Sequence, residues 1–508
     1  MGKNRQIPII DIFAGPGGLG EGFSAAEEVT DGRKLFRIAL SVEKEDYAHR
    51  TLQLRAFFRE FDSDSIPEEY YQFLGGEISQ EALFQRYPYQ SRKAMKVAWK
   101  AELGVVNSDE VDQRIKKTLK GETSWVLMGG PPCQAYSIAG RSRMAKVWTE
   151  EPDKKEDDPK HFLYREYLRI IKKHRPPIFV MENVRGMLSA QVSEGRISDL
   201  ILDDLHKLEY SLYSFSRQSG TEVQKSHPED FVIQCEKFGI PQTRHRVIIL
   251  GVRNDIKVKP DPLDPRETIA LIDVIDNLPK IRSGLSKQKD TGSDWVSVIN
   301  EFRSNGLLSS VSLDDAVRNE ISTQLGSLSK TLTRGQEYTP RNNIEPQILL
   351  NWFSDHRLKG VCNHTSRGHM AEDIHRYFFS SCFARVKKYS PKLCDFPKAL
   401  LPKHLNVDEG VSGNKFSDRF RVQLADRPAT TITSHISKDG HYFIHYDPWQ
   451  CRSLTVREAA RIQTFPDNYF FVGPRTSQYS QVGNAVPPLL ARNIADKIYR
   501  LFLDAKLI

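Results

Sequence analysis

The chain has 508 residues, of which 39% are hydrophobic and 27% are charged. That length predicts two or more structural units with a large core, and no apolar run comes near the roughly 18 residues of a membrane span, so we expect no membrane association. The formal net charge of +8 suits a polyanionic partner, although many enzymes of small metabolites are equally basic.

In the first half of the chain, short apolar runs alternate with stretches of helical spacing. The runs that predict strands are 7–13, 36–43, 125–129, 176–184 and 246–253. The stretches that predict helices are 47–61, 161–174 and 198–210. Alternation of this kind over about 250 residues predicts a mostly parallel, doubly wound α/β sheet.

The second half is patterned differently. Residues 256–415 mix Pro, Ser, Asn and charged residues with few sustained periods, which favours a smaller, loop-rich domain. Regular sequence patterns resume at 427–433 and 441–447. They are followed by a predicted helix at 456–465 and a long amphipathic helix within 481–503. We therefore expect a first domain with an insertion, a smaller domain and a C-terminal segment that rejoins the first domain. Their expected boundaries are 1–255 (insertion near 60–105), 256–476 and 477–508.

A glycine-rich turn follows the first predicted strand, in the sequence DIFAGPGGLGEGF. Gly15, Gly17 and Gly20 fit the spacing Gly-x-Gly-x-x-Gly, which lets a backbone approach a ligand closely. Alone, the pattern serves dinucleotides, S-adenosylmethionine (AdoMet) or turns without a ligand. Glu43 ends the next strand, where a carboxylate either accepts hydrogen bonds from ribose hydroxyls or is simply solvated.

Three further motifs lie at strand ends. GGPPCQAYS presents Cys133 after a strand, in a frame of glycines and prolines that an inert core cysteine does not need. MENV places Glu182 at another strand end, where it could form a nucleophile–acid pair with the thiol. QTRHR begins a strand, and the alternation points Gln242, Arg244 and Arg246 the same way. The two guanidinium groups suit phosphate or base oxygens, or an exposed salt-bridged strand end.

The remaining cysteines give no metal-binding pattern. The six cysteines of the chain include no Cys-x-x-Cys pair. Cys362, His364, His369 and Cys382 are close enough in sequence to raise the idea of zinc, but scattered residues of this kind are usually structural. We expect no metal, and free thiols in a reducing cytoplasm.

Taken in order, the motifs FAGPGG, GGPPCQ, ENV, QTRHR, RPATTIT and QVGNAVPP resemble those of the DNA (cytosine-5)-methyltransferases, chiefly the bacterial restriction–modification enzymes. They cover residues 9–253 and 420–495. The resemblance implies a Rossmann-like AdoMet-dependent catalytic domain and a smaller, loop-rich target-recognition domain. The partner it implies is double-stranded DNA, with possible restriction or phage-defence components beside an enzyme that acts as a monomer in the cytoplasm of a bacterium.

The resemblance also implies roles for single residues. Cys133 matches the nucleophile that adds to C6 of a flipped cytosine, and Glu182 matches the residue that contacts N3 and the amino group. Arg246 matches the residue that holds O2, with Arg244 as support. The residues that match the AdoMet site are Phe13, Ala14, Gly15, Gly17, Gly18, Leu19, Glu43, Asn484 and Val486.

The chain departs from the family pattern in two places. Ala135 and Tyr136 replace the Pro-Phe that follows Cys-Gln in many relatives, although the tyrosine keeps an aromatic surface. The acidic contact to the adenine amino group has no clear match in 100–112.

Three alternative functions stay open at this point. An RNA-directed cytosine-5 methyltransferase would keep the fold and change the substrate, but the long segment before RPATTIT favours readout of duplex DNA. A non-catalytic DNA-binding regulator would not need an intact Cys133, Glu182 and Arg246. A Rossmann oxidoreductase shares only the glycine loop and leaves the other motifs unexplained.

Overall fold

The computed structural model describes most of the chain, namely residues 6–131, 159–192, 195–216, 227–304, 308, 313–340, 346, 348–403, 407–413 and 417–508. These residues form two compact units. The first unit comprises Met1–Ile66, Phe84–Glu267 and Ala485–Ile508, and the second comprises Pro67–Leu83 and Thr268–Asn484. The contacts therefore divide the chain at Glu267 and Asn484, and they assign part of the expected insertion to the second unit.

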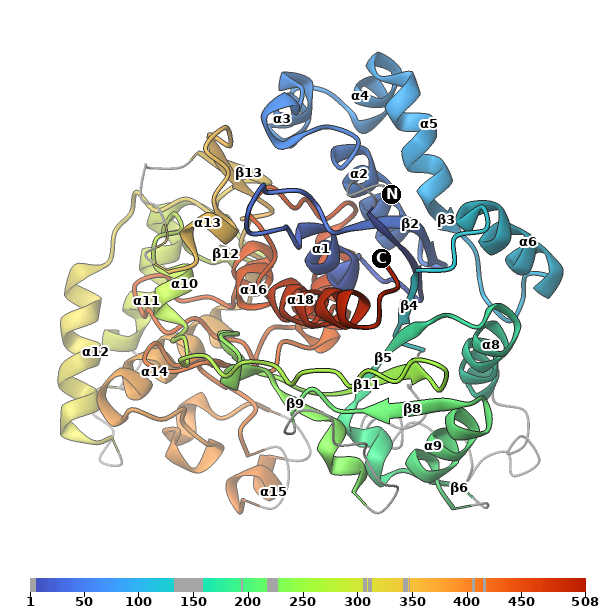
Figure 1. Ribbon diagram of the computed structural model, residues 1–508. Coiled ribbons are helices and arrows are strands. Elements are labelled where there is room, and N and C mark those ends of the chain that lie inside the picture. Colours follow the sequence, from blue (N-terminus) through green and yellow to red (C-terminus); the bar gives the residue numbers. More distant parts are fainter. Residues whose placement is uncertain are drawn as a thin grey trace. The chain divides into compact units, whose positions relative to one another are not determined.

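The first unit is built on one sheet with the strand order β3-β2-β1-β4-β5-β11-β8, and β9 pairs with β11 (Figure 1). The first five strands of the chain pair in parallel, and β8, β9 and β11 run antiparallel to their neighbours. The order reverses between β1 and β4, so the predicted doubly wound, mainly parallel α/β fold is confirmed. The strands are β1 (Ile7–Ile12), β2 (Phe36–Glu43), β3 (Ala98–Lys100), β4 (Val126–Gly129), β5 (Ile178–Val184), β8 (Tyr210–Tyr213), β9 (Val232–Gln234) and β11 (His245–Arg253).

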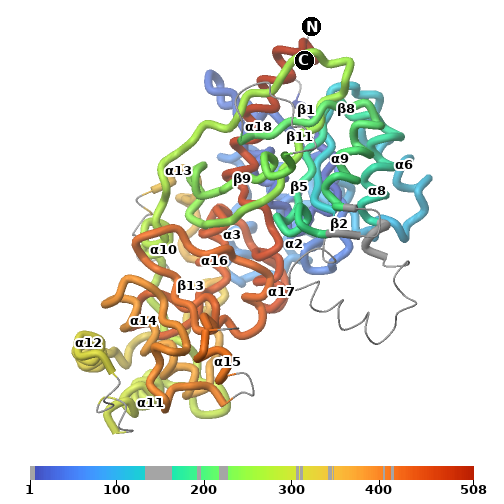
Figure 2. Tube along the Cα trace, turned by 90° about the horizontal axis from the view of Figure 1, so that it is seen from below, coloured from blue at the N-terminus to red at the C-terminus, as the bar shows by residue number. Residues whose placement is uncertain are grey.

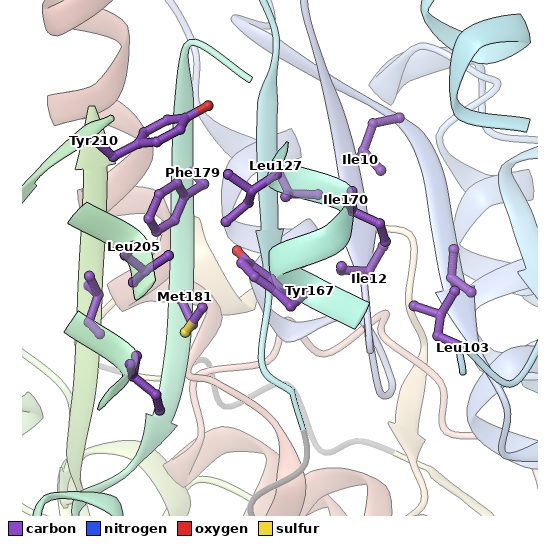
Figure 3. Close-up of a cluster of buried hydrophobic side chains, with 14 of the residues drawn as sticks. Ile10, Ile12, Leu103, Leu127, Tyr167, Ile170, Phe179, Met181, Leu205 and Tyr210 are labelled. Atoms are coloured by element: carbon purple, nitrogen blue, oxygen red, sulfur yellow. The ribbon is translucent and has the colours of Figure 1, made fainter. Parts of the chain in front are cut away.

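Three helices, α6 (Ser108–Leu119), α8 (Pro159–His174) and α9 (Ile197–Lys207), lie side by side against one face of this sheet (Figure 1, Figure 2). Figure 3 shows how side chains of β1, β4 and β5 meet those of α8 and α9. Tyr167 of α8 is fully buried there and donates a hydrogen bond to the carbonyl oxygen of Val180 at 3.0 Å. Strands that are covered by helices carry mostly apolar side chains, which accounts for the apolar runs in the sequence.

The C-terminal helix α18 (Pro488–Asp504) packs against α1 (Gly18–Ala25) within the first unit. The approach is close, since a Cβ at Gly22 would lie 2.2 Å from the carbonyl oxygen of Pro488. The long amphipathic helix expected within 481–503 is α18, and α17 (Arg475–Asn484) ends before it. Proline lacks the backbone N–H that a helix interior needs, so Pro487 and Pro488 separate the two helices. Helices α2 (Asp46–Phe58) and α5 (Pro88–Val97) complete the unit.

The second unit has a core of its own, formed by α11 (Gly292–Ser304), α12 (Asp315–Ser327) and α14 (Ala371–Lys387). Short strand pairs and long irregular connections surround it. Its strands are β12 (Gly284–Leu285), β13 (Tyr338–Pro340), β14 (Gly360–Cys362), β15 (Gly368–His369) and β16 (Ala429–Thr430). Its shorter helices are α3 (Glu68–Leu74), α10 (Ile272–Ile275), α13 (Leu350–Phe353), α15 (Val407–Val411) and α16 (Val456–Ile462); α4 (Gln80–Arg86) crosses the boundary.

Two buried ion pairs fix the end of the second unit. Arg452 contacts both carboxylate oxygens of Glu458, at 2.7 and 2.6 Å. Arg461 likewise contacts both oxygens of Asp467, at 2.8 and 2.7 Å. Bidentate pairs of this kind satisfy charges that would be costly to bury alone. Among the helices of the described residues, none is both long and apolar enough to cross a bilayer.

Candidate active site

The site lies at the carboxyl end of the sheet of the first unit, where the predicted residues line up across neighbouring strands. In each pair of neighbouring strands, the residues that come one position before the predicted site residues are Cα partners in the sheet. Glu43 after β2 is therefore level with Phe13 after β1, with Gly130 after β4 and with Glu182 in β5. Glu43 and Glu182 are three strand spacings apart, or roughly 14 Å. The fold thus brings residues from four separate motifs to one edge, where open α/β sheets bind ligands.

The loop between β1 and α1 has an unusual backbone. Phe13, Gly15 and Gly17 have positive φ angles of 56°, 56° and 94°. Glycine takes this conformation readily, whereas a phenylalanine there is strained, and strained residues cluster at functional sites. The Ala14 amide donates to the carbonyl oxygen of Val42 at 3.1 Å and ties the loop to β2. Gly17 is the N-cap of α1, so the first amides of the helix are available beside the loop.

Glu43 holds this loop directly. Its Oε2 accepts a hydrogen bond from the Gly15 amide at 2.8 Å, and its Oε1 accepts from the amides of Lys44 and Glu45 at 2.9 and 2.8 Å. Burial raises the pKa of Glu43, and the backbone hydrogen bonds partly oppose that rise. Glu43 therefore forms part of the hydrogen-bonded structure of the loop and is not a solvated residue at a strand end.

Val486 reaches the same loop from the C-terminal segment. A Cβ at Gly18 would lie 2.2 Å from the carbonyl oxygen of Val486, so only glycine allows this approach. Leu19, the next residue, is buried. Asn484 is the last residue of α17 and of the second unit, and its side chain is exposed.

Sequence reasoning missed Asp11, a carboxylate in the middle of β1. Asp11 is fully buried, and its two oxygens have no hydrogen-bond partner in the described part of the chain. Its Oδ2 lies beneath α1, 3.3 Å from the position of a Cβ on Gly20. Burial raises the pKa of Asp11 well above its ordinary value, the charge of Arg59 lowers it and that of Glu43 raises it. The signal was present in the sequence, because an acid interrupts the apolar run IPIIDIF.

Glu182 and Arg246 form an ion pair at the other end of the site. Arg246 of β11 is a diagonal neighbour of Glu182 across the antiparallel β5–β11 pair, and its Nε lies 3.0 Å from Glu182 Oε1. Arg246 Nη1 donates to the His245 carbonyl oxygen at 2.9 Å, and Nη2 has no partner among the described residues. The pair therefore presents a carboxylate and a guanidinium donor side by side.

Arg244 is buried near this pair. Burial lowers the pKa of Arg244 to about 9, the charge of Arg246 lowers it further and that of Glu182 opposes the shift. Cys235, whose amide donates to the Arg244 carbonyl oxygen at 3.1 Å, is the neighbouring thiol. Burial raises its pKa to about 12, so Cys235 stays protonated and is a poor nucleophile.

The segment that leads to the predicted nucleophile contacts β5. A Cβ at Gly130 would lie 2.8 Å from Glu182 Oε2, so a glycine leaves the space that this carboxylate occupies. The Asn183 side chain donates to the carbonyl oxygen of Pro131 at 3.4 Å. Pro131 precedes Cys133 by two residues in the sequence. Cys133, with Ala135 and Tyr136, lies outside the described residues.

The residues considered for zinc have other partners. His364 is buried and uses both ring nitrogens, with Nδ1 3.0 Å from Thr455 Oγ1 and Nε2 2.8 Å from the Pro279 carbonyl oxygen. Burial raises the pKa of the Cys362 thiol to about 12. Within the described ranges, no three His, Cys, Asp or Glu side chains are grouped so as to hold a metal ion.

Comparison with known proteins decides the family. The family model of the C-5 cytosine-specific DNA methylases matches residues 90–500. The chain belongs to this family. It is therefore a DNA (cytosine-5)-methyltransferase, as the order of the motifs indicated. The glycine loop and Glu43 precede the matched residues.

Individual relatives of this methyltransferase agree. The type II methyltransferase M.Bpa9945I of Bacillus paralicheniformis is 32% identical over 512 residues, which span 96% of this chain and 97% of the relative. The DNA (cytosine-5-)-methyltransferase M.ApeKI of Aeropyrum pernix is 25% identical over 452 residues, or 80% and 87% of the two chains. A prophage-encoded protein of E. coli, described as a DNA modification methyltransferase, has a similar fold, with a TM-score of 0.52 at 17% identity over 98% of this chain and 100% of that one.

Proposed function

We propose that this methyltransferase transfers a methyl group from AdoMet to C5 of a flipped cytosine in a specific duplex DNA sequence, through a covalent bond between Cys133 and C6. The observation that carries the proposal is the Glu182–Arg246 pair, at 3.0 Å, level with Gly130 and therefore next to the segment that leads to Cys133. The enzyme would act as a monomer in a bacterial cytoplasm, with a restriction enzyme or a phage-defence system beside it.

The pair is complementary to one edge of cytosine. That edge presents O2, N3 and the amino group in a row. Arg246 Nη2 would donate to O2, while Glu182 would contact N3 and accept from the amino group. Since the two side chains already contact each other, they are oriented before the base arrives. Arg244, buried beside them, keeps positive charge next to O2.

The reaction needs a nucleophile because C5 of cytosine is too electron-poor to take a methyl group directly. Cys133 would add to C6 as a thiolate, and the electron pair of the C5–C6 double bond would make C5 nucleophilic. A hydrogen bond or proton from Glu182 at N3 favours this addition. Once C5 is methylated, loss of its proton restores the double bond and expels the Cys133 sulfur. Since the target base starts inside the stack, flipping costs roughly a few kcal/mol, which contacts to the DNA must offset.

The residues around the glycine loop fit AdoMet. Glu43 would bind the ribose hydroxyls, and the loop at Phe13, Gly15 and Gly17 lets the backbone approach the ligand. The orphaned oxygens of Asp11 keep acceptor groups beneath α1, the helix that follows the loop, which suits a ligand that carries an ammonium group. Bound there, AdoMet supplies an electrophilic methyl group.

Bisulfite sequencing tests the proposed function. A plasmid is purified from a host that expresses the full chain, and its cytosines are converted. We expect protected cytosines at one recurring sequence. A fully converted plasmid together with protected cytosines in RNA would show that the substrate is RNA.

We expect Glu43→Ala to weaken AdoMet binding about ten- to a hundredfold, because the loss of charge-assisted ribose hydrogen bonds costs roughly 1.5–3 kcal/mol. Calorimetry on the purified variant measures the dissociation constant. Glu122→Ala is the control, since the Glu122 side chain is only 11% exposed and pairs with Arg37, at 2.8 Å, near the amino ends of β2 and β4, opposite to the carboxyl ends where the site lies. An unchanged dissociation constant in Glu43→Ala would remove Glu43 from the cofactor site.

The same carboxylate predicts a pH dependence. The ionised form of Glu43 accepts the ribose hydrogen bonds, and burial raises its pKa. AdoMet affinity should therefore be full well above this raised pKa and should fall as the pH decreases through it, at a higher pH than an ordinary glutamate would give. Glu43→Gln should bind more weakly and lose this dependence. Parallel pH profiles for the two proteins would contradict the prediction.

We expect Gly130→Ala to reduce the turnover rate at least roughly tenfold while stability and AdoMet affinity stay unchanged. The added Cβ would lie 2.8 Å from Glu182 Oε2, the flexible end of a side chain, and would displace that carboxylate. The Glu182 carbonyl oxygen, 3.3 Å from the Cβ, would need to move by only a few tenths of an ångström. Single-turnover methylation and thermal unfolding separate the two effects. Gly326→Ala is the control, because a Cβ there meets no atom within 4 Å. A wild-type rate in Gly130→Ala would show that the position of Glu182 does not limit the reaction.

A further inference from the structure

Two arginines of the second unit, Arg334 and Arg475, converge on one peptide carbonyl group, and Arg367 is next to that group in the chain. We refer to Arg334, Arg367 and Arg475 as the arginine cluster. The Ser366 carbonyl oxygen accepts hydrogen bonds from Arg334 Nη2, at 3.1 Å, and from Arg475 Nη1. Arg367 is the next residue, and its guanidinium carbon lies 4.5 Å from the centre of the Tyr479 ring. Segments more than 100 residues apart in the chain therefore meet at this point.

The positive charge of the cluster is not balanced by carboxylates. Arg334 pairs with Asp290 at 3.0 Å, but Asp290 also pairs with Arg282 at 2.5 Å. In the part of the chain that the structure describes, Arg367 and Arg475 form no ion pair. Arg367 instead donates to backbone carbonyl oxygens. Arg334 and Arg282 thus share one carboxylate, and this excess of cations attracts an anion.

Neighbouring groups respond to this charge. His369 is buried between the same residues, and its pKa is lowered well below the ordinary value, first by burial and then by the charges of Arg367, His441, Arg475 and Arg334. Burial also lowers the pKa of Arg475; the charges of Arg334 and Arg367 lower it further, whereas Tyr479 and Glu337 oppose the shift. The cluster is therefore a region of positive potential in which one more cation is unfavourable.

Several donors of the cluster are also unused. Among the described residues, the Nε groups of Arg334 and Arg367 and the Oγ of Ser366 are buried atoms without a hydrogen-bond partner. Buried donors are nearly always satisfied in folded proteins, so orphaned donors on neighbouring side chains indicate a missing acceptor. The side chains are still reachable, since the Arg334 side chain is 35% exposed and Arg367 and Arg475 are half-buried.

We propose that the arginine cluster binds one phosphodiester group of the DNA backbone, an inference that rests on the proposed function because it takes duplex DNA as the substrate. Planar guanidinium groups match a phosphate with paired N–H donors. The cluster offers donors and no free carboxylate, so it suits a phosphate better than the mixed edge of a base.

The same contact would position a neighbouring segment. Arg367 donates to the carbonyl oxygens of Ile436 and Lys438, at 2.6 and 2.8 Å, in the turn that follows RPATTIT. A phosphate held by the cluster would therefore fix this turn, with the exposed Lys438, relative to the duplex. Phosphate contacts of this kind set the position of the protein without reading the sequence.

The salt dependence of DNA binding tests the proposal. A short fluorescent duplex of arbitrary sequence suffices as the probe, because phosphate contacts dominate nonspecific binding. The slope of log Kd against log salt should fall by about one in Arg334→Gln and by more in Arg334→Gln/Arg367→Gln. Arg318→Gln is the control, since its side chain is 33% exposed and pairs with Asp315. Folded variants with the wild-type slope would overturn the proposal.

A footprinting experiment uses the wild-type protein, so its result does not depend on whether a variant folds. Phenylglyoxal modifies accessible arginines, and mass spectrometry compares each one with and without duplex DNA. Arg334, Arg367 and Arg475 should be protected by DNA, and Arg318 should not. Equal modification with and without DNA would overturn the proposal. The proposed function would still stand in that case if the plasmid were methylated. Protection by RNA but not by DNA would overturn both.

Discussion

Cys133→Ala should abolish methyl transfer, the largest effect that we expect from any single substitution. Without the sulfur no bond to C6 can form, and C5 stays too electron-poor to be methylated. DNA binding should stay within about tenfold of the wild type, because the contacts that position the duplex lie elsewhere. Incorporation of radiolabelled methyl groups into DNA measures the first effect, and a gel-shift titration measures the second.

A second cysteine provides the control for this experiment. Cys394 is exposed in the second unit, so Cys394→Ala should keep wild-type turnover. The described cysteines Cys235 and Cys362 are buried, and burial raises the pKa of each to about 12, which makes them unsuitable substitutes. Normal turnover by Cys133→Ala would remove this residue from the mechanism.

Glu182→Gln should lower the turnover rate roughly 10²- to 10⁴-fold, the range that a positioned acid or base contributes. The amide keeps the size of the side chain but cannot supply a proton at N3. It also weakens the contact with Arg246, whose Nε lies 3.0 Å from Glu182 Oε1 in the wild-type protein. AdoMet affinity should not change, since Glu43 is roughly 14 Å away across the sheet and the glycine loop, which follows β1, is roughly 10 Å away. Single-turnover kinetics and calorimetry measure the two quantities.

The adjacent strand position offers a matched control. Glu236 pairs with His245, the residue before Arg246, at 2.9 Å. Glu236 lies in the 3-10 turn that follows β9, so Glu236→Gln changes a nearby carboxylate without touching the Glu182–Arg246 contact and should keep the wild-type rate. If Glu182→Gln also kept the wild-type rate, the base would have to be activated by another group.

Much of the first unit could be predicted because its strands are short apolar runs that end in motifs. The end of β2 at Glu43 was predicted to the residue, and the residues at 13, 43, 130 and 182 become level because the strands pair in register. The direction of β11 was not predicted. An apolar run has the same pattern in a parallel and an antiparallel strand, so only the structure shows that Arg246 is a diagonal neighbour of Glu182.

Helix α14 of the second unit was missed for a physical reason, whereas α16 lies within the helix expected at 456–465. From Tyr377 to Ala384 every residue of α14 is buried, so this stretch has no exposed polar face and its sequence shows no amphipathic period. The arginine cluster was missed as well, because Arg334, Ser366 and Arg475 are distant in sequence and no local pattern joins them. Asp11 was visible as an acid in an apolar strand, but its lack of a partner is a property of the fold.

The central claim is a covalent bond between Cys133 and C6 of cytosine in duplex DNA, and trapping that bond tests it most directly. A duplex in which 5-fluorocytosine replaces cytosine is incubated with the full chain and AdoMet, and the products are separated under denaturing conditions. Fluorine at C5 cannot leave as a proton, so the Cys133 sulfur cannot be expelled. We predict a stable adduct whose peptide map places the nucleotide on Cys133, and none with Cys133→Ala. Turnover on ordinary cytosine without any adduct on the fluorinated duplex would contradict the mechanism.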